Sequence, residues 1–150
     1  MTTRQVHYTV GNENSPTDPF GRSVLVISPD GAANLEHHFS RSRTVGRWTG
    51  RVDPAALQSL WSELDRAGFP AMPNASFLPG SSVRNLVVEV DGTPRQALID
   101  WHGSAKLPGY AEAFDLLDGI IRQLSGDTVR YPTKQPAIVH EVAEVAAPVS

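Results

Sequence analysis

The chain has 150 residues, 40% of them hydrophobic and 19% charged, which is typical of a folded domain with one hydrophobic core. The formal net charge of −3 excludes the basic surplus with which general nucleic-acid binders neutralise phosphates. Cysteine is absent, which excludes disulfide bonds, thiolate catalysis and cysteine-bound zinc.

The first seven residues contain no apolar stretch of the kind that a signal peptide has. No run in the chain approaches the roughly 18 apolar residues that a membrane-spanning helix needs. We therefore expect a soluble cytoplasmic protein that does not bind membranes.

The first third of the chain predicts β-strands. Apolar and polar residues alternate over residues 5–10, and residues 23–28 form a short run rich in β-branched side chains. The turn formers at 29–31 follow at once, so residues 23–39 predict a β-hairpin. Residues 44–52 predict a further strand, with Trp48 pointing into the core.

Residues 53–68 predict the first helix. Asp53 is a favoured N-cap residue, and Pro54 at the first helical position loses no hydrogen bond that a helix needs. Gly68 provides a natural end, and Pro70 prevents the helix from continuing. The apolar residues of this segment recur at spacings of three and four: Leu57, Leu60, Trp61 and Leu64.

A second hairpin is predicted for residues 85–91 and 95–101, because Asp91 and Gly92 form a strong turn signal between two alternating runs. Trp101 would lie on the apolar face of its second strand. Residues 108–124 then predict the second helix. Its apolar stripe consists of Phe114, Leu117, Ile120, Ile121 and Leu124.

Strand pairs joined by tight turns indicate an antiparallel sheet, and both helix stripes must be buried against it. We therefore predict an α+β fold with four to six antiparallel strands and two helices on one face, a two-layer sandwich. Residues 1–126 would form a single domain. Residues 127–150 would form a C-terminal extension, with a possible edge strand at 137–145 and a disordered tail.

Histidine and aspartate residues at strand ends suggest one possible chemistry. His37 and His38 are neighbours in a strand, so they point to opposite faces and cannot both bind one metal ion. A metal site from His38, Asp100 and His102 would require their strands to pair. Asp100, His102 and Ser104 are also the residue types of a catalytic triad, but sequence neighbours rarely meet in that relay.

Arginine is concentrated on the expected strand at 44–52 and just before it. The candidate binding residues there are Arg43, Arg47, Trp48 and Arg51. The arginines share a parity and would line one face of the strand, where an interface or an anionic ligand would find them. Alternatively, Trp48 would pack in the hydrophobic core and take no part in binding.

Two further surfaces are candidate interaction sites. The proline-rich loop at 70–82 carries Phe77 and Leu78, which either pin the loop to the core or contact a partner. Glu112, Asp115 and Asp118 are spaced by three on the second helix, and we expect them on its polar face, either solvated or as an acidic patch.

Two short patterns in the middle of the chain carry a family resemblance: AGFP at residues 67–70 and VDG at residues 90–92. With the order of the expected elements, they make residues 41–124 resemble the emfourin type of small bacterial protein. Members of that family are inhibitors of thermolysin-like metalloproteases, and many relatives have no known role. The resemblance implies an inhibitor-like role and transfers no site residue.

These patterns favour a non-enzymatic protein-interaction module, inhibitor-like or immunity-like, with a protein partner and no cofactor. Two alternatives stay open. One is a small metal-dependent hydrolase that uses His38, Asp100 and His102. The other is a binder of a small anionic ligand at the arginine-rich strand.

Overall fold

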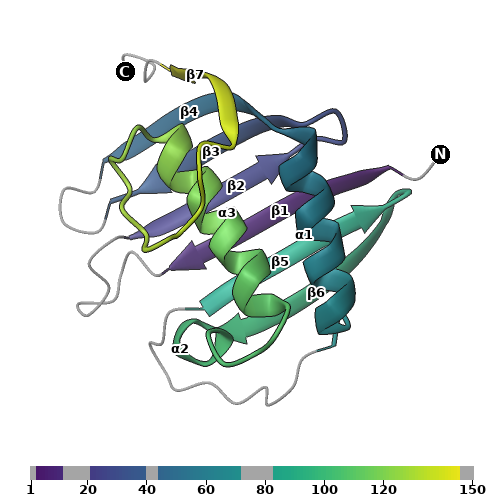
Figure 1. The fold of residues 1–150 in the computed structure, drawn as a ribbon. Coiled ribbons are helices and arrows are strands. Elements are labelled where there is room, and N and C mark those ends of the chain that lie inside the picture. The colour runs from purple at the N-terminus through teal and green to yellow at the C-terminus, as the bar shows by residue number, and fades with distance from the viewer. Residues whose placement is uncertain (1–2, 12–20, 40–43, 72–82, 146–150) are drawn as a thin grey trace.

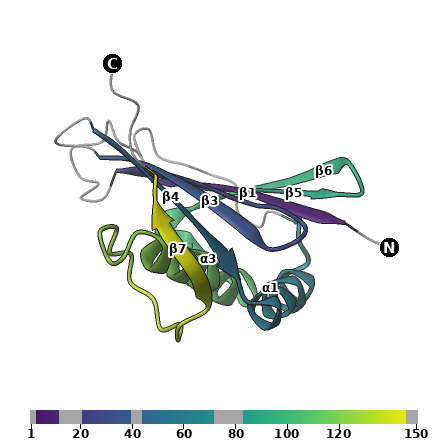
Figure 2. The same ribbon diagram turned by 90° about the horizontal axis from the view of Figure 1, so that it is seen from above.

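The computed structural model describes residues 3–11, 21–39, 44–71 and 83–145, without the side chain of His102. These residues form a seven-stranded antiparallel sheet with two long helices packed against it (Figure 1). Figure 2 shows that both helices lie on the same side of the sheet. The predicted α+β class and its layer arrangement are confirmed.

The described strands are β1 (Arg4–Gly11), β2 (Arg22–Ile27), β3 (Ala32–His38), β4 (Val45–Val52), β5 (Val83–Val90), β6 (Thr93–Asp100) and β7 (Val139–Glu144). The helices are α1 (Pro54–Ala67), the short α2 (Trp101–Ser104) and α3 (Tyr110–Leu124). The strand order is β6-β5-β1-β2-β3-β4-β7, and each neighbouring pair is antiparallel.

Both predicted hairpins are present, as β2–β3 and β5–β6. The turn of the second has positive φ at Asp91 (50°) and Gly92 (85°), which is the geometry of a type I′ turn. The predicted count of four to six strands is wrong. The structure has seven because residues of the predicted C-terminal extension form β7 and pair with β4 along the edge of the sheet.

Gly50 of β4 explains how this edge packs. A side chain there would place its Cβ 2.5 Å from Leu124 and 3.1 Å from Val139, so the missing side chain leaves room for both. Asp53 is the N-cap of α1 as predicted, but its side chain makes no capping hydrogen bond. It lies instead 3.1 Å from His140 of β7 and so joins the start of α1 to the edge strand.

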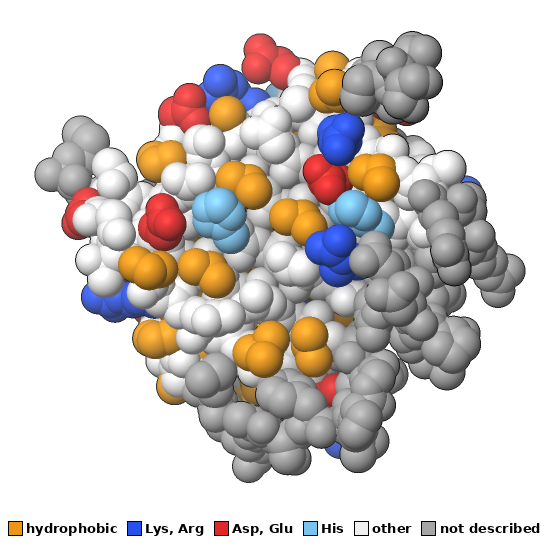
Figure 3. Space-filling model, turned by 180° about the vertical axis from the view of Figure 1, so that it is seen from behind, with side chains coloured by type: hydrophobic (Ala, Val, Ile, Leu, Met, Phe, Trp, Pro, Cys, Tyr) orange, Lys and Arg blue, Asp and Glu red, His pale blue; other side chains and the backbone are white. Residues whose placement is uncertain are grey.

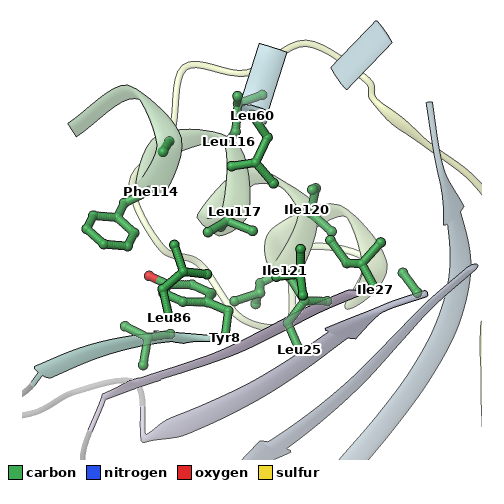
Figure 4. Packing of buried hydrophobic residues seen from close by; sticks show 14 of the residues in the cluster. Tyr8, Leu25, Ile27, Leu60, Leu86, Phe114, Leu116, Leu117, Ile120 and Ile121 are labelled. Carbon is green, nitrogen blue, oxygen red and sulfur yellow. The ribbon is translucent and has the colours of Figure 1, made fainter. Parts of the chain in front are cut away.

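The two long helices lie side by side, and their apolar stripes are buried against the strands. Figure 4 shows the packed side chains of α1 (Leu60), α3 (Phe114, Leu116, Leu117, Ile120 and Ile121) and the sheet (Tyr8, Leu25, Ile27 and Leu86). Each fully buried apolar side chain contributes about 1.5–3 kcal/mol. This layer is therefore the main source of stability.

Gly109 sets the distance between the two helices. Its φ is 85°, and a Cβ at this position would lie 2.6 Å from the backbone of Glu63 and Ala67 in the last turn of α1. Only glycine fits this close approach. The predicted start of the second helix at residue 108 is wrong by two residues, because Gly109 is the N-cap and its N–H donates to Glu112 at 2.8 Å.

Trp101 does not continue β6, so its predicted place on the strand is wrong. The Asp100 carboxylate accepts the N–H of Gly103 at 3.0 Å and turns the chain into α2. Trp101 therefore leaves the sheet and packs on the Tyr131 ring, with the ring centroids 5.5 Å apart. Three residues of the predicted extension lie in the core: Val129, Tyr131 and Ile138.

Within residues 3–11, 21–39, 44–71 and 83–145, no helix covers the opposite face of the sheet (Figure 2). The register places both apolar and charged residues on it, including Val24, Val26, Val87, Leu98, His7, Glu36 and Arg47. In the described part of this face, Figure 3 shows hydrophobic side chains as separate spots between polar and charged ones. Such a mixed face is compatible with solvent.

Candidate functional site

A buried charged cluster lies where β1, β5 and α3 meet. Arg84 of β5 is 7% exposed and Asp118 of α3 is 2% exposed. The Nη1 of Arg84 donates to both carboxylate oxygens of Asp118, at 2.9 and 3.1 Å. The hydroxyl of Tyr8 donates to Asp118 at 3.0 Å and accepts from the same Nη1. The three side chains therefore form one hydrogen-bonded unit.

Aromatic rings and a hydroxyl hold the guanidinium of Arg84 in place. Its Cζ lies 3.9 Å from the centroid of the Trp101 ring and 4.9 Å from that of Phe114. Its Nε donates to the hydroxyl of Ser104 at 2.9 Å, and that hydroxyl donates to the carbonyl of Trp101 at 2.8 Å. The short helix α2 thus holds Nε of Arg84, whereas Asp118 holds Nη1.

One nitrogen of Arg84 has no hydrogen-bond acceptor in the described part of the protein. Nε and Nη1 make the contacts above, whereas Nη2 donates to no acceptor among the described residues. Every fully buried side-chain nitrogen or oxygen of these residues has a hydrogen-bond partner, so Nη2 must be open to solvent. It carries two N–H donors on a rigid, permanently charged group.

Arg84 lines a cavity of about 420 Å³ between α2, α3 and the segment after α3. This volume is within the range of small-molecule sites. Arg84, Phe114 and Asp118 form its inner wall. The remaining lining residues are Ser104, Ala105, Ala111, Glu112, Asp115, Pro132, Lys134 and Gln135.

Burial controls the ionisation of the inner wall. It raises the pKa of Asp118 to about 6, against the opposing effects of the Arg84 charge and of the hydrogen bonds from Arg84 and Tyr8. It also raises the pKa of Tyr8 well above its ordinary value, so the hydroxyl stays protonated. At neutral pH the cluster is therefore a carboxylate, a guanidinium and a neutral phenol.

A second buried cluster contains a nucleophile and a base but has no access. The hydroxyl of Ser23 lies 2.6 Å from Nδ1 of His37 and 3.0 Å from the hydroxyl of Tyr131. Ser23 is 0% exposed, and the other two are 1% exposed. The group is therefore buried, and its contacts fasten the segment around Tyr131 to the sheet.

The predicted binding residues of β4 are placed on two faces. Arg47 and Arg51 lie on the uncovered face of the sheet, as their shared parity predicted, whereas Trp48 is buried in the core. Arg47 pairs with Glu36 at 3.3 Å, and Arg51 pairs with Glu141 at 3.4 Å. The other predicted binding residues, Arg43, Phe77 and Leu78, lie outside the described residues.

The strands that carry His38 and Asp100 do not pair. Four strand spacings separate β3 from β6, which amounts to about 19 Å. His38 Nε2 lies 2.7 Å from Glu36, and the side chain of His102 is outside the described part. Among the described residues, no three His, Asp or Glu side chains are grouped to hold a metal ion.

The sequence interpretation missed the Arg84 cavity and misplaced one of its residues. Asp118 was expected on the polar face of the second helix, but it is buried. Two features of the sequence indicate that Arg84 and Asp118 are buried. Arg84 shares the strand parity of buried Leu86 and Val88, and Asp118 follows Phe114 by four residues on the apolar stripe. An arginine and an aspartate on two buried faces indicate a buried ion pair.

No family model, no curated protein and no solved structure matches this chain. The resemblance to emfourin-type proteins therefore stays a prediction. Within the described residues, no helix has the length and apolar character needed to cross a membrane.

Proposed function

We propose that this protein is a non-catalytic binding domain whose cavity takes a carboxylate group of its ligand at Arg84. The observation that carries the proposal is the guanidinium of Arg84, which lines the 420 Å³ cavity, is held through Nε and Nη1, and has no acceptor for Nη2 among the described residues. A carboxylate placed there accepts two N–H bonds from a group that needs no reorganisation.

Lys134 supplies a second positive charge to the same cavity. No carboxylate among the described residues lies within ion-pair distance of its ammonium group. Binding is favoured over catalysis because the hydroxyl of Ser104 is held between Arg84 and the Trp101 carbonyl instead of facing a base. The hydrophobic wall at Phe114 suits the carbon chain of a small organic acid.

A titration with pentanoate tests this proposal, with pentanamide as the uncharged control of equal chain length. Binding is measured by calorimetry at constant ionic strength, and the Nε–H signal of Arg84 is followed by NMR. We expect pentanoate to shift that signal and Lys134→Met to weaken binding at least 5-fold. If carboxylates up to 50 mM neither bind nor shift the Arg84 signal, the proposal is wrong.

The carboxylate could belong to a free small molecule or to a peptide chain, and the same assay separates the two sources. A short peptide with a free C-terminus is compared with the same peptide carrying an amidated C-terminus. Tighter binding of the free-acid peptide than of pentanoate identifies a protein-borne carboxylate. Equal or weaker binding identifies a small molecule.

A protein-interaction surface around Trp61 is a second candidate. The Cζ of Arg4 lies 5.1 Å from the Trp61 ring, and both residues line two cavities of about 110 and 340 Å³. Tryptophan and arginine dominate the energetics of protein interfaces. Capture of a cellular partner by the native protein but not by Trp61→Ala supports this candidate, and equal capture by both opposes it.

A further inference from the structure

The charged groups that line the Arg84 cavity divide into neutralised and uncompensated ones. Arg84 and Asp118 neutralise each other at 2.9 Å inside the inner wall. Glu112 is paired at 3.0 Å with Arg66, which also pairs with Glu63 at 3.0 Å, and it accepts the N–H of Gly109. Asp118 therefore brings little net charge to a ligand, and the charge of Glu112 is compensated in part.

Asp115 and Lys134 remain as one uncompensated negative and one uncompensated positive charge. Asp115 accepts hydrogen bonds from neutral donors, the backbone N–H of Lys134 at 3.2 Å and the side-chain amide of Gln135 at 2.7 Å. Neither donor cancels the negative charge of the carboxylate. The cavity thus presents groups of both signs, the carboxylate of Asp115 and the ammonium of Lys134, whereas Arg84 adds hydrogen-bond donors whose charge Asp118 already balances.

We infer that the ligand is a small zwitterion, which places its carboxylate at Arg84 and Lys134 and its ammonium group at Asp115. This inference rests on the proposed function and names the ligand class of the same cavity. A simple carboxylate would leave Asp115 uncompensated in a partly enclosed site, where the repulsion between like charges is stronger than in water. A phosphate dianion would double that repulsion.

Asp115 has the capacity for such a contact. A carboxylate oxygen accepts two hydrogen bonds, and each oxygen of Asp115 accepts one from the protein. An ammonium group offers three donors and carries the opposite charge. The contact therefore needs no rearrangement of the hydrogen bonds that hold residues 134 and 135 against α3.

A ladder of ω-amino acids tests the inference, from glycine to 6-aminohexanoate, because it varies the distance between the two charges. The best member of the ladder is compared with the carboxylic acid and with the amine of the same chain length, by calorimetry at constant ionic strength. We expect the zwitterion to bind at least 10-fold more tightly than either single-charge analogue. In Asp115→Asn, this advantage over the acid should disappear.

Asp127→Asn is the matched control, because Asp127 is an exposed aspartate outside the cavity, and this variant should keep the native preference. If the acid binds as tightly as the zwitterion, the inference is wrong and the proposed carboxylate site stands. If neither zwitterions nor acids bind, both are wrong. If the amine binds as tightly as the zwitterion, the site recognises cations, which also contradicts both.

Discussion

Replacing Arg84 by methionine is the sharpest test of the buried cluster. The change removes the two contacts to Asp118, at 2.9 and 3.1 Å, and leaves a carboxylate that is 2% exposed without its cation. Removal of one partner of a buried ion pair costs about 3–5 kcal/mol. With a urea dependence of about 2 kcal/mol per M, the unfolding midpoint should fall by roughly 1.5–2.5 M.

The loss of unfolding free energy in Arg84→Met should depend on pH, because Asp118 can become neutral by binding a proton. Burial already raises its pKa to about 6 in the native protein, and Arg84 opposes that rise, so removing Arg84 raises the pKa further. A carboxyl group whose pKa is higher in the folded state than in the unfolded state stabilises the fold at pH values below its unfolded-state pKa. That stabilisation is lost as the pH rises through the folded-state pKa. Arg84→Met should therefore be much less destabilised at pH 5 than at pH 8.

The matched control is Arg122→Met. Arg122 pairs with Asp127 at 2.8 Å, but their side chains are 37% and 67% exposed, so we expect a loss below about 1 kcal/mol at either pH. The double variant Arg84→Met with Asp118→Asn should recover most of the loss at pH 8. Equal losses for Arg84→Met at pH 5 and pH 8, or a loss no larger than that of the control, would refute the reasoning.

Three further predictions follow from single features of the fold. The pKa of Asp118, about 6 against an ordinary 3.8, should make this group's contribution to the unfolding free energy fall by up to about 3 kcal/mol as pH rises from 4 to 8. Urea titrations of Asp118→Asn should lack this part of the pH dependence. Gly109→Ala would place a Cβ 2.6 Å from the backbone of α1 at a φ of 85°, so thermal unfolding should show a loss of at least about 2 kcal/mol. Ser23→Ala removes the contacts of its hydroxyl with His37 and Tyr131 and should cost about 1–3 kcal/mol. Hydrogen exchange should then be faster at the amide of Val129 than in the native protein, and unchanged exchange there would contradict the fastening role of Ser23.

Local patterns predicted most of the fold because each element has its own spacing of apolar residues and its own turn-forming or capping residues at the ends. The turn at Asp91 and Gly92 and the end of α1 at Gly68 follow from backbone preferences that neighbouring residues determine. The departure of Trp101 from β6 was missed, since the hydrogen bond from Gly103 to Asp100 competes with strand pairing at a point where both are possible. The edge strand β7 was only a possibility, because its residues are largely exposed and show little alternation.

The candidate site could not be predicted from local patterns, because it is formed by contacts between segments that are distant in the sequence. Tyr8, Arg84 and Asp118 come from β1, β5 and α3, and the residues after α3 close the cavity. A search for motifs favours residues that are neighbours in sequence, such as those around Asp100. The parity of Arg84 and the stripe position of Asp118 indicate burial, but only the register of β5 beside β1 shows that these residues meet.

The buried pair of Arg84 and Asp118 bears both on the stability of the fold and on the proposed binding site. Replacing a buried ion pair by apolar residues of similar volume is often neutral or stabilising, so stability alone does not account for the cost of burying Arg84. What the pair does provide is position: Asp118, Tyr8 and Ser104 fix the guanidinium of Arg84 at the wall of the cavity. The variant Tyr8→Phe, Arg84→Met, Asp118→Leu separates the two roles. If this variant unfolds at the same urea concentration as the native protein but no longer binds carboxylates, the cluster serves recognition. If the variant is far less stable than the native protein, the cluster holds the fold together.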